Sequence, residues 1–143
     1  ALVIILLVGC ANTKYGDKDT EARLRQFQPI PEKTRLYVCR EAASIVGAGG
    51  RATVVVDGNP IGTLKPSNFA HSIVDPGIHN IYLKVSPGFD SGTLQISSQA
   101  GEIAFVWVGI VGGGWGGLSV DFFSTKREAE NCVQSAEYSI PAD

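Results

Sequence analysis

Short segments of β-favouring residues, separated by turn signals at nearly regular intervals, dominate this chain from residue 34 onward. Apolar and polar residues alternate in several of them, as in strands that bury one face. In residues 78–85, for example, Ile81, Leu83 and Val85 fall on one side. The predicted strands are residues 34–40, 52–56, 61–64, 69–74, 78–85, 93–97, 103–111 and 118–123. Strands of this length and spacing are typical of an antiparallel β-sandwich or barrel.

One helix is expected after the strands. Thr125 is followed three residues later by Glu128, which is the pattern of a capping box. The small and apolar residues that share one helical face after this point are Ala129, Cys132, Val133 and Ala136. We therefore expect a helix over residues 126–135 that packs on the sheet. The fold class predicted is mainly β, an antiparallel sandwich with one C-terminal α-helix.

Composition sets limits on size and on function. The chain has 143 residues, enough for one domain, and 44% of them are apolar, enough for a real core. The formal net charge is −2, so no global basic field would attract a nucleic acid, and we expect no nucleic-acid partner.

The first ten residues point to a membrane. Residues 1–9 read ALVIILLVG, a run too short to span a bilayer as a helix, which takes about 20 residues. The run has the length of a signal-peptide core. Leu7-Val8-Gly9-Cys10 resembles the lipobox of bacterial lipoproteins. That resemblance implies diacylglyceryl attachment to the thiol of Cys10, removal of residues 1–9 and, with Ala11 next, sorting to the outer membrane.

Residues 10–33 are polar and contain two prolines, so we expect a lipidated N-terminus followed by a tether. Within it, residues 21–27 have the composition for a turn or two of helix that ends before Pro29. Phe27 and Ile30 are candidates for packing on the edge of the domain. The predicted division is residues 1–9 as signal segment, 10–33 as lipidated linker and 34–143 as β-sandwich domain.

A family resemblance rests on four segments that recur in a fixed order. They are Thr34-Arg35-Leu36-Tyr37-Val38, Val55-Val56-Asp57-Gly58-Asn59-Pro60-Ile61-Gly62, Val74-Asp75-Pro76-Gly77-Ile78-His79 and Ala100-Gly101-Glu102. With the lipobox, this layout resembles the small bacterial lipoproteins known as domain of unknown function 2846, which are similar to PEGA domains. The resemblance implies a PEGA-like, Ig-like β-sandwich on the periplasmic side of a membrane, and it supplies no catalytic residue.

Of the three cysteines, one is the candidate lipid site and the other two are candidates for a disulfide. If Cys10 carries the lipid, Cys39 and Cys132 remain as an even pair in an oxidising compartment. A disulfide between them would join the first predicted strand to the predicted helix. The alternative is a pair of separate buried thiols, because a free cysteine packs as a small apolar residue.

Other residues give weaker signals. His71 and His79 lie on successive predicted strands around Pro76-Gly77 and so approach each other if these form a hairpin, but two histidines without a third ligand make a poor metal site. We therefore expect no metal, no cofactor and no catalytic residue. The Gly-rich segment around Trp115 lacks the Gly-Lys-Ser/Thr ending of a phosphate loop. Trp115, with Gly114 and Gly116, is the candidate contact residue for a partner protein, a glycan or a lipid interface.

Three hypotheses for function follow. The first is a non-enzymatic lipoprotein of the cell envelope, held through Cys10 at the periplasmic face of the outer membrane, whose sandwich contacts another envelope protein or the cell wall. The second is a structural subunit of a larger assembly that retains residues 1–9 as an apolar packing helix. The third is a glycan- or ligand-binding module that uses the segment around Trp115.

Overall fold

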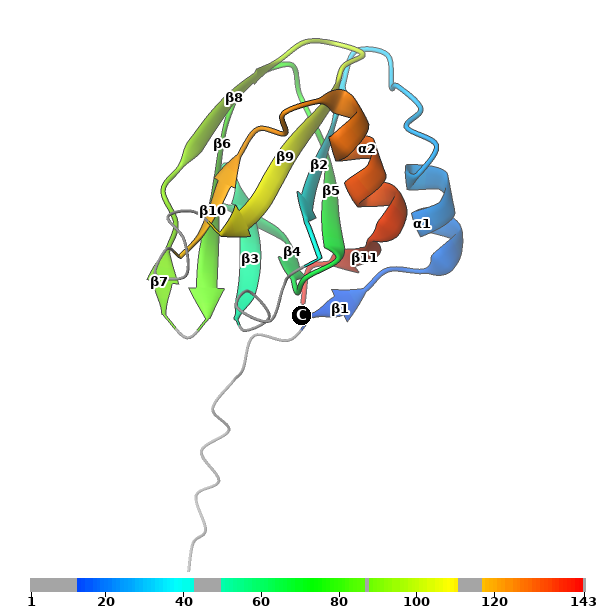
Figure 1. Cartoon of the computed structure of the whole chain (residues 1–143). Helices are drawn as coiled ribbons and strands as arrows, with labels where there is room; N and C mark the ends of the chain where they lie inside the picture. The colour runs from blue at the N-terminus through cyan, green and yellow to red at the C-terminus, as the bar shows by residue number, and fades with distance from the viewer. Residues whose placement is uncertain (1–12, 43–49, 87, 111–116, 143) are drawn as a thin grey trace, which may run out of the picture.

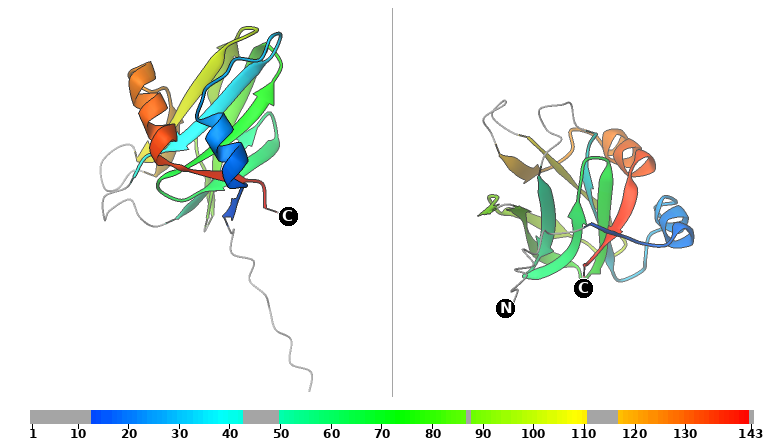
Figure 2. Two further views of the ribbon diagram at one scale, coloured as in Figure 1. Left: turned by 90° about the vertical axis from the view of Figure 1, so that its right-hand side faces the viewer. Right: turned by 90° about the horizontal axis from the view of Figure 1, so that it is seen from below.

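The computed structural model describes residues 13–42, 50–86, 88–110 and 117–142 of the chain. It is mainly β, with two sheets packed face to face and two helices on the outer side of one sheet (Figures 1 and 2). The predicted β-sandwich is therefore confirmed in its main feature. Within the described residues, neither helix is long and apolar enough to cross a membrane.

The larger sheet has six strands in the order β1-β11-β5-β2-β9-β10. Their bounds are Lys14–Tyr15 (β1), Glu137–Ile140 (β11), Asn68–Val74 (β5), Thr34–Arg40 (β2), Ile103–Ile110 (β9) and Leu118–Asp121 (β10). Two of the pairings, β2 with β9 and β11 with β5, are parallel. The prediction of a wholly antiparallel sandwich is wrong for this sheet, because alternation along a strand says which side chains are buried but not which strand lies alongside.

The smaller sheet is antiparallel throughout. It contains Asn59–Leu64 (β4), Arg51–Val56 (β3), Gly77–Ser86 (β6), Phe89–Asp90 (β7) and Leu94–Ser98 (β8), with β3 between β4 and β6 and with β7 and β8 both on β6. The hairpin predicted around Asp57 is present and is tighter than expected. Asp57 and Gly58 have φ angles of 49° and 83°, the left-handed region that a two-residue hairpin turn requires.

The main core lies between the two sheets. Leu36 and Val38 of β2 are fully buried against Val54 of β3 and Leu83 of β6. Ile81, Leu83 and Val85 are all buried, as the alternation of residues 78–85 predicts. Ser139 of β11 joins the two layers at one side: its hydroxyl donates to the carbonyl of Thr63 at 2.8 Å and accepts from the N–H of Thr63 at 3.2 Å.

A second core lies on the outer face of the larger sheet, under the helices α1 (Lys18–Leu24) and α2 (Lys126–Ser135). The predicted helix over residues 126–135 is confirmed, with the hydroxyl of Thr125 accepting from the N–H of Glu128 at 3.1 Å. The buried residues of this second core are Leu24, Tyr37, Cys39, Phe69, Val133 and Ala136. Because β2 buries both of its faces, the domain has three layers: helices, sheet and sheet.

The segment expected to be a tether belongs to the fold from Lys14 onward. β1 pairs with β11, and α1 packs beside α2, so the domain includes two elements that precede residue 34. The helical turns predicted for residues 21–27 begin earlier, at Lys18, because Asp17 caps the helix with its side chain. Phe27 does pack on the domain, edge-on against Tyr37 and Phe105 at ring-centroid distances of 5.3 and 5.6 Å.

Cys39 and Cys132 lie at disulfide distance, with 2.08 Å between their sulfur atoms, in agreement with the predicted pairing. Cys39 lies on the outer face of β2, and Cys132 lies on the side of α2 that faces the sheet. The bond therefore fixes α2 over the second core and closes a loop with a sequence separation of 93 residues.

We expect reduction of this disulfide to lower the free energy of unfolding by about 4 to 5 kcal/mol, because a cross-link over so long a loop restricts the unfolded chain. Urea denaturation of oxidised and reduced protein, both in a Cys10→Ser background, measures the difference. The Cys39→Ala/Cys132→Ala variant is the control and should be insensitive to reductant. Equal stability of the oxidised and reduced forms would contradict the prediction.

Candidate functional site

The N-terminal segment is the part of the molecule closest in sequence to the proposed lipid site, so its attachment to the domain bears directly on function. Only three residues, 11 to 13, separate Cys10 from the start of β1 at Lys14. The N–H of Gly16 donates to the carbonyl of Tyr138 at 3.0 Å, and this continues the β1–β11 pairing. A Cβ at Gly16 would lie 2.3 Å from the ring of Tyr138, so only glycine fits here.

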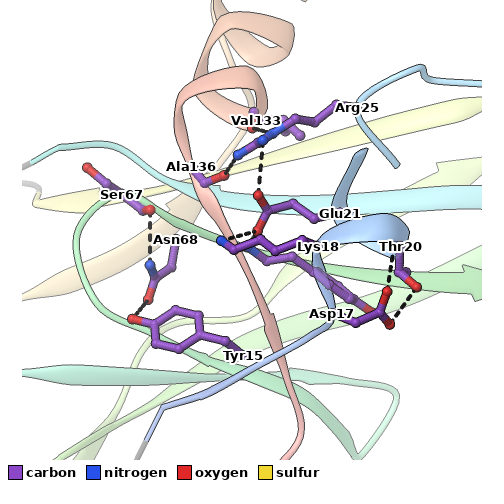
Figure 3. Close-up of polar contacts among 11 residues, drawn as sticks. Tyr15, Asp17, Lys18, Thr20, Glu21, Arg25, Ser67, Asn68, Val133 and Ala136 are labelled. Carbon is purple, nitrogen blue, oxygen red and sulfur yellow. Dashed lines mark hydrogen bonds and ion pairs between the residues drawn. The ribbon is translucent and has the colours of Figure 1, made fainter. Parts of the chain in front are cut away.

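Glu21 is the centre of the attachment of α1 (Figure 3). Although charged, its side chain is only 6% exposed. One carboxylate oxygen lies 3.0 Å from Nη1 of Arg25, and the other accepts from the backbone N–H of Tyr138 at 3.0 Å. Lys18 contacts the same group at 3.5 Å from a largely solvent-exposed position. The carboxylate is thus satisfied on both oxygens, which burial of a charge requires.

Arg25 and its neighbours join the ends of the two helices. The guanidinium of Arg25 donates to the carbonyls of Val133 and Ala136 at the end of α2 (Figure 3). In return, the side-chain amide of Gln134 donates to the carbonyl of Arg25 at 2.7 Å. Arg25 and Ala136 are the C-cap residues of α1 and α2, where helix carbonyls lack the partners of the helix interior. The carbonyl of Val133 also accepts from the N–H of Ala136 at 3.2 Å. Each helix therefore caps the other, and α1 is held by polar contacts as well as by Leu24.

Tyr37 of β2 also helps to attach α1 to the sheet. Its hydroxyl donates to the carbonyl of Leu24 at 2.6 Å from within the second core. Burial raises the pKa of Tyr37 to about 12, so the phenol stays protonated and remains a donor. The residue lies between Phe27, Phe69, His71 and Phe105 and contacts all four rings.

The two histidines lie in different sheets, and the turn at Pro76-Gly77 crosses between them. The expected approach of His71 to His79 across a hairpin is therefore wrong, because β5 pairs with β2 and β6 pairs with β3. Among the described residues, no group of three or more His, Cys, Asp or Glu side chains is close enough to hold a metal ion.

His79 lies between two acceptors. Its Nδ1 is 2.5 Å from a carboxylate oxygen of Asp57, and its Nε2 is 2.6 Å from the carbonyl of Asp75. Both contacts are hydrogen bonds only when the ring carries both protons. Burial alone would lower the pKa of His79, but the hydrogen bonds to Asp57 and Asp75 outweigh it and raise that pKa. With Nε2 directed at a carbonyl, the ring is not placed to accept a proton from a nucleophile, and its contacts hold the hairpin turn.

The pKa of His71 is shifted in the opposite direction to that of His79. Burial, and then the neighbouring charge of Arg35, lower its pKa to about 4, so the ring is neutral at physiological pH. It packs on Tyr37 with ring centroids 4.9 Å apart, and its Nε2 lies 3.2 Å from Nη1 of Arg35.

The remaining predicted site residues lie outside the described part of the chain. These are Cys10, Gly114, Trp115 and Gly116. Trp107, the other tryptophan, lies on β9 and lines a hollow with Glu41, Asp121 and Phe123. Sequence reasoning missed Glu21, Arg25 and the Arg35–His71 contact. The i, i+4 spacing of Glu21 and Arg25 is a local signal of their ion pair, but their backbone partners and His71 lie far along the chain or on another element.

No model of a known protein family matches this chain, and no curated protein sequence is significantly similar to it.

We expect replacement of Glu21 by Ala to lower the free energy of unfolding by about 2 to 3 kcal/mol, because it leaves the N–H of Tyr138 and the charge of Arg25 without their partner. Urea denaturation gives the stability, and hydrogen exchange of residues 18–24 shows whether α1 opens. Lys18→Ala is the matched control: its exposed ammonium contributes under about 0.5 kcal/mol. The same loss in both variants would contradict a central role for Glu21.

From the pKa shifts of the two histidines, we expect the free energy of unfolding to decrease both above and below about pH 6.5. Above it, the raised pKa of His79 means that the folded protein keeps a proton that the unfolded chain has lost, so stability decreases as pH rises through the folded pKa. Below it, the unfolded chain protonates His71 while the folded protein does not until about pH 4, so stability decreases as pH falls. Each slope is at most about 1.4 kcal/mol per pH unit.

Urea denaturation across this range, at constant ionic strength, measures both effects. His79→Gln should flatten the alkaline side only, and His71→Gln the acidic side above pH 4 only. If His79→Gln leaves the alkaline slope unchanged, the proposed protonation of both ring nitrogens is wrong.

Proposed function

We propose that this chain is a bacterial lipoprotein of the cell envelope, anchored through acyl chains on Cys10, with a non-catalytic domain that contacts another envelope component. The single observation that carries the proposal is Leu7-Val8-Gly9-Cys10, an apolar run that ends in aliphatic and small residues before a cysteine. Two or three acyl chains anchor a protein stably on a membrane, since each buried CH₂ contributes roughly 0.8 kcal/mol. We place the anchor at the periplasmic face of the outer membrane, because Ala11 and not Asp follows the cysteine.

The pairing of β1 with β11, only a few residues after Cys10, supports an anchor that holds the domain close to the membrane in one orientation. The chain from Cys10 to Lys14 spans at most about 14 Å when fully extended. From Lys14 on, the backbone is paired with β11, and α1 follows directly. A lipid on Cys10 would therefore hold the folded domain against the membrane surface, and the end of the domain that carries β1 and the C-terminus would face the lipid (Figure 1).

The disulfide and the finer family likeness fit the same proposal. A Cys39–Cys132 bond is typical of proteins that mature in an oxidising compartment such as the periplasm. We include in the proposal the resemblance to domain of unknown function 2846 and to the PEGA-like form of the sandwich. The partner is another envelope protein or the cell wall, and no activity is assigned.

Expression of the gene in bacteria tests the anchor. We expect the wild-type protein to incorporate labelled palmitate, to sediment with membranes and to begin at an acylated Cys10 by mass spectrometry. Cys10→Ser should lose the label and leave the membrane fraction. The matched control is Cys39→Ala/Cys132→Ala, which removes the other two cysteines and should still be lipidated. Recovery of membrane-bound protein with residues 1–9 attached to an unmodified Cys10 would refute the proposal.

A further inference from the structure

A cleft with a volume of about 440 Å³ lies between α1 and the outer face of β2 and β5. Its size is in the range of sites for small ligands and peptide ends. Leu24, Ile73 and the ring of Tyr138 supply apolar surface, and Ile73 is 52% exposed. The polar side chains that line it include Arg23, Gln26, Gln28, Arg35 and His71.

Arg35 is held in a fixed position in this cleft. Its Nε donates to the carbonyl of Gln28 at 2.6 Å, and its Nη1 lies 3.2 Å from Nε2 of His71. Because His71 is neutral, Nε2 accepts this hydrogen bond when the ring proton is on Nδ1. A guanidinium has five N–H groups in one plane, so the contacts of Nε and Nη1 fix that plane and leave Nη2 to donate to a ligand.

Within the described residues, no carboxylate forms an ion pair with the guanidinium of Arg35. Neither Arg35 nor Arg23 is in an ion pair there, and no Asp or Glu lines the cleft. Asp17, which interacts electrostatically with Arg23, caps α1 and accepts two hydrogen bonds from Thr20. The hydroxyl of Thr20 also accepts from Nη2 of Arg23 at 3.1 Å. By contrast, Arg25 and Lys33 each face a carboxylate. A fixed guanidinium without a carboxylate partner, beside apolar surface, is the arrangement that recognises an organic anion.

We propose that this cleft binds the terminal carboxylate of a peptide. Arg35 forms the charged contact, for which the planar guanidinium and the planar carboxylate are matched in shape. Arg23, exposed on α1, adds a second positive charge at the opening. The side-chain amides of Gln26 and Gln28 can donate to and accept from peptide groups, and Ile73 offers an apolar contact for a side chain. The cleft belongs to the folded domain, so the proposal holds whether or not Cys10 is lipidated.

Binding of a peptide to the full chain that carries the Cys10→Ser substitution tests the proposed carboxylate site. The probe is the acetylated tetrapeptide Ala-Ala-Val-Ala with a free C-terminal carboxylate, and the comparison is the same peptide with a C-terminal amide. We expect the acid to shift the NMR resonances of Arg35 and His71 and to bind at least about tenfold more tightly than the amide. Inorganic phosphate at equal ionic strength should bind more weakly than the acid peptide.

Charge variants assign the contact to Arg35. Arg35→Gln should remove the preference for the acid over the amide, and Arg23→Gln should reduce it only a few-fold. Lys84→Gln is the matched control, because it removes the same charge from an exposed position on β6 in the other sheet and should change nothing. NMR spectra of each variant without peptide show whether the fold is intact; if Arg35→Gln does not fold, Arg23→Gln carries the test.

Four results would overturn the proposal, three with the wild-type cleft and one with a variant. The first three are equal affinity for acid and amide, no binding of the acid at about 10 mM, and phosphate binding as tight as that of the peptide. Loss of binding in Lys84→Gln as large as in Arg23→Gln would also overturn it, since only the net charge would then matter. None of these results bears on lipidation of Cys10, so the two proposals fail separately.

Discussion

Burial of β2 on both faces is the constraint on which the rest of the structure depends. Leu36 and Val38 face the smaller sheet, and Tyr37 and Cys39 face outward, yet all four are fully buried. A two-layer sandwich would leave the outward pair in water, so a third layer is required. The helices α1 and α2 provide it, and the disulfide and the contacts of Glu21 keep them in place.

This requirement couples the N-terminal segment to the stability of the domain. A flexible tether would leave the domain free to turn relative to its anchor, whereas here β1 and α1 are part of the packed structure. Any force applied near Cys10 therefore acts on the β1–β11 pairing and on the network around Glu21. The same coupling places the opening of the Arg35 cleft beside α1, at a fixed position relative to the start of the folded chain.

Much of the fold could be predicted from the sequence, because local patterns report burial directly. The positions of the eight predicted strands, the hairpin at Asp57 and the cap of α2 at Thr125 each depend on neighbours within a few residues. The strands β1, β7 and β11 were not predicted, because two of them are only two residues long and β11 directly follows a helix. The parallel pairing of β2 with β9 could not be predicted, since alternation carries no information about the neighbouring strand. The polar segment before residue 34 has the pattern of a tether, because the contacts that hold it are distant in sequence: Glu21 accepts from the N–H of Tyr138, and Arg25 donates to the carbonyl of Ala136.

The candidate site could not be predicted from the sequence either, because the protonation state of each histidine depends on its burial and on partners from other elements. His71 and His79 are the same residue type in β-strands of similar composition, yet one is neutral and the other is favoured in its charged form. Burial lowers the pKa of His71, and the guanidinium of Arg35 adds to this effect. For His79, the hydrogen bonds to Asp57 and Asp75 outweigh burial and raise the pKa. A neutral histidine accepts from Arg35 without adding a second positive charge, so Arg35 is oriented while its own charge stays unpaired. Glu21 and Arg25, by contrast, balance each other, as burial of charges demands. The uncompensated charge at Arg35 is tolerated because its cleft is open to solvent, and the same opening admits a ligand.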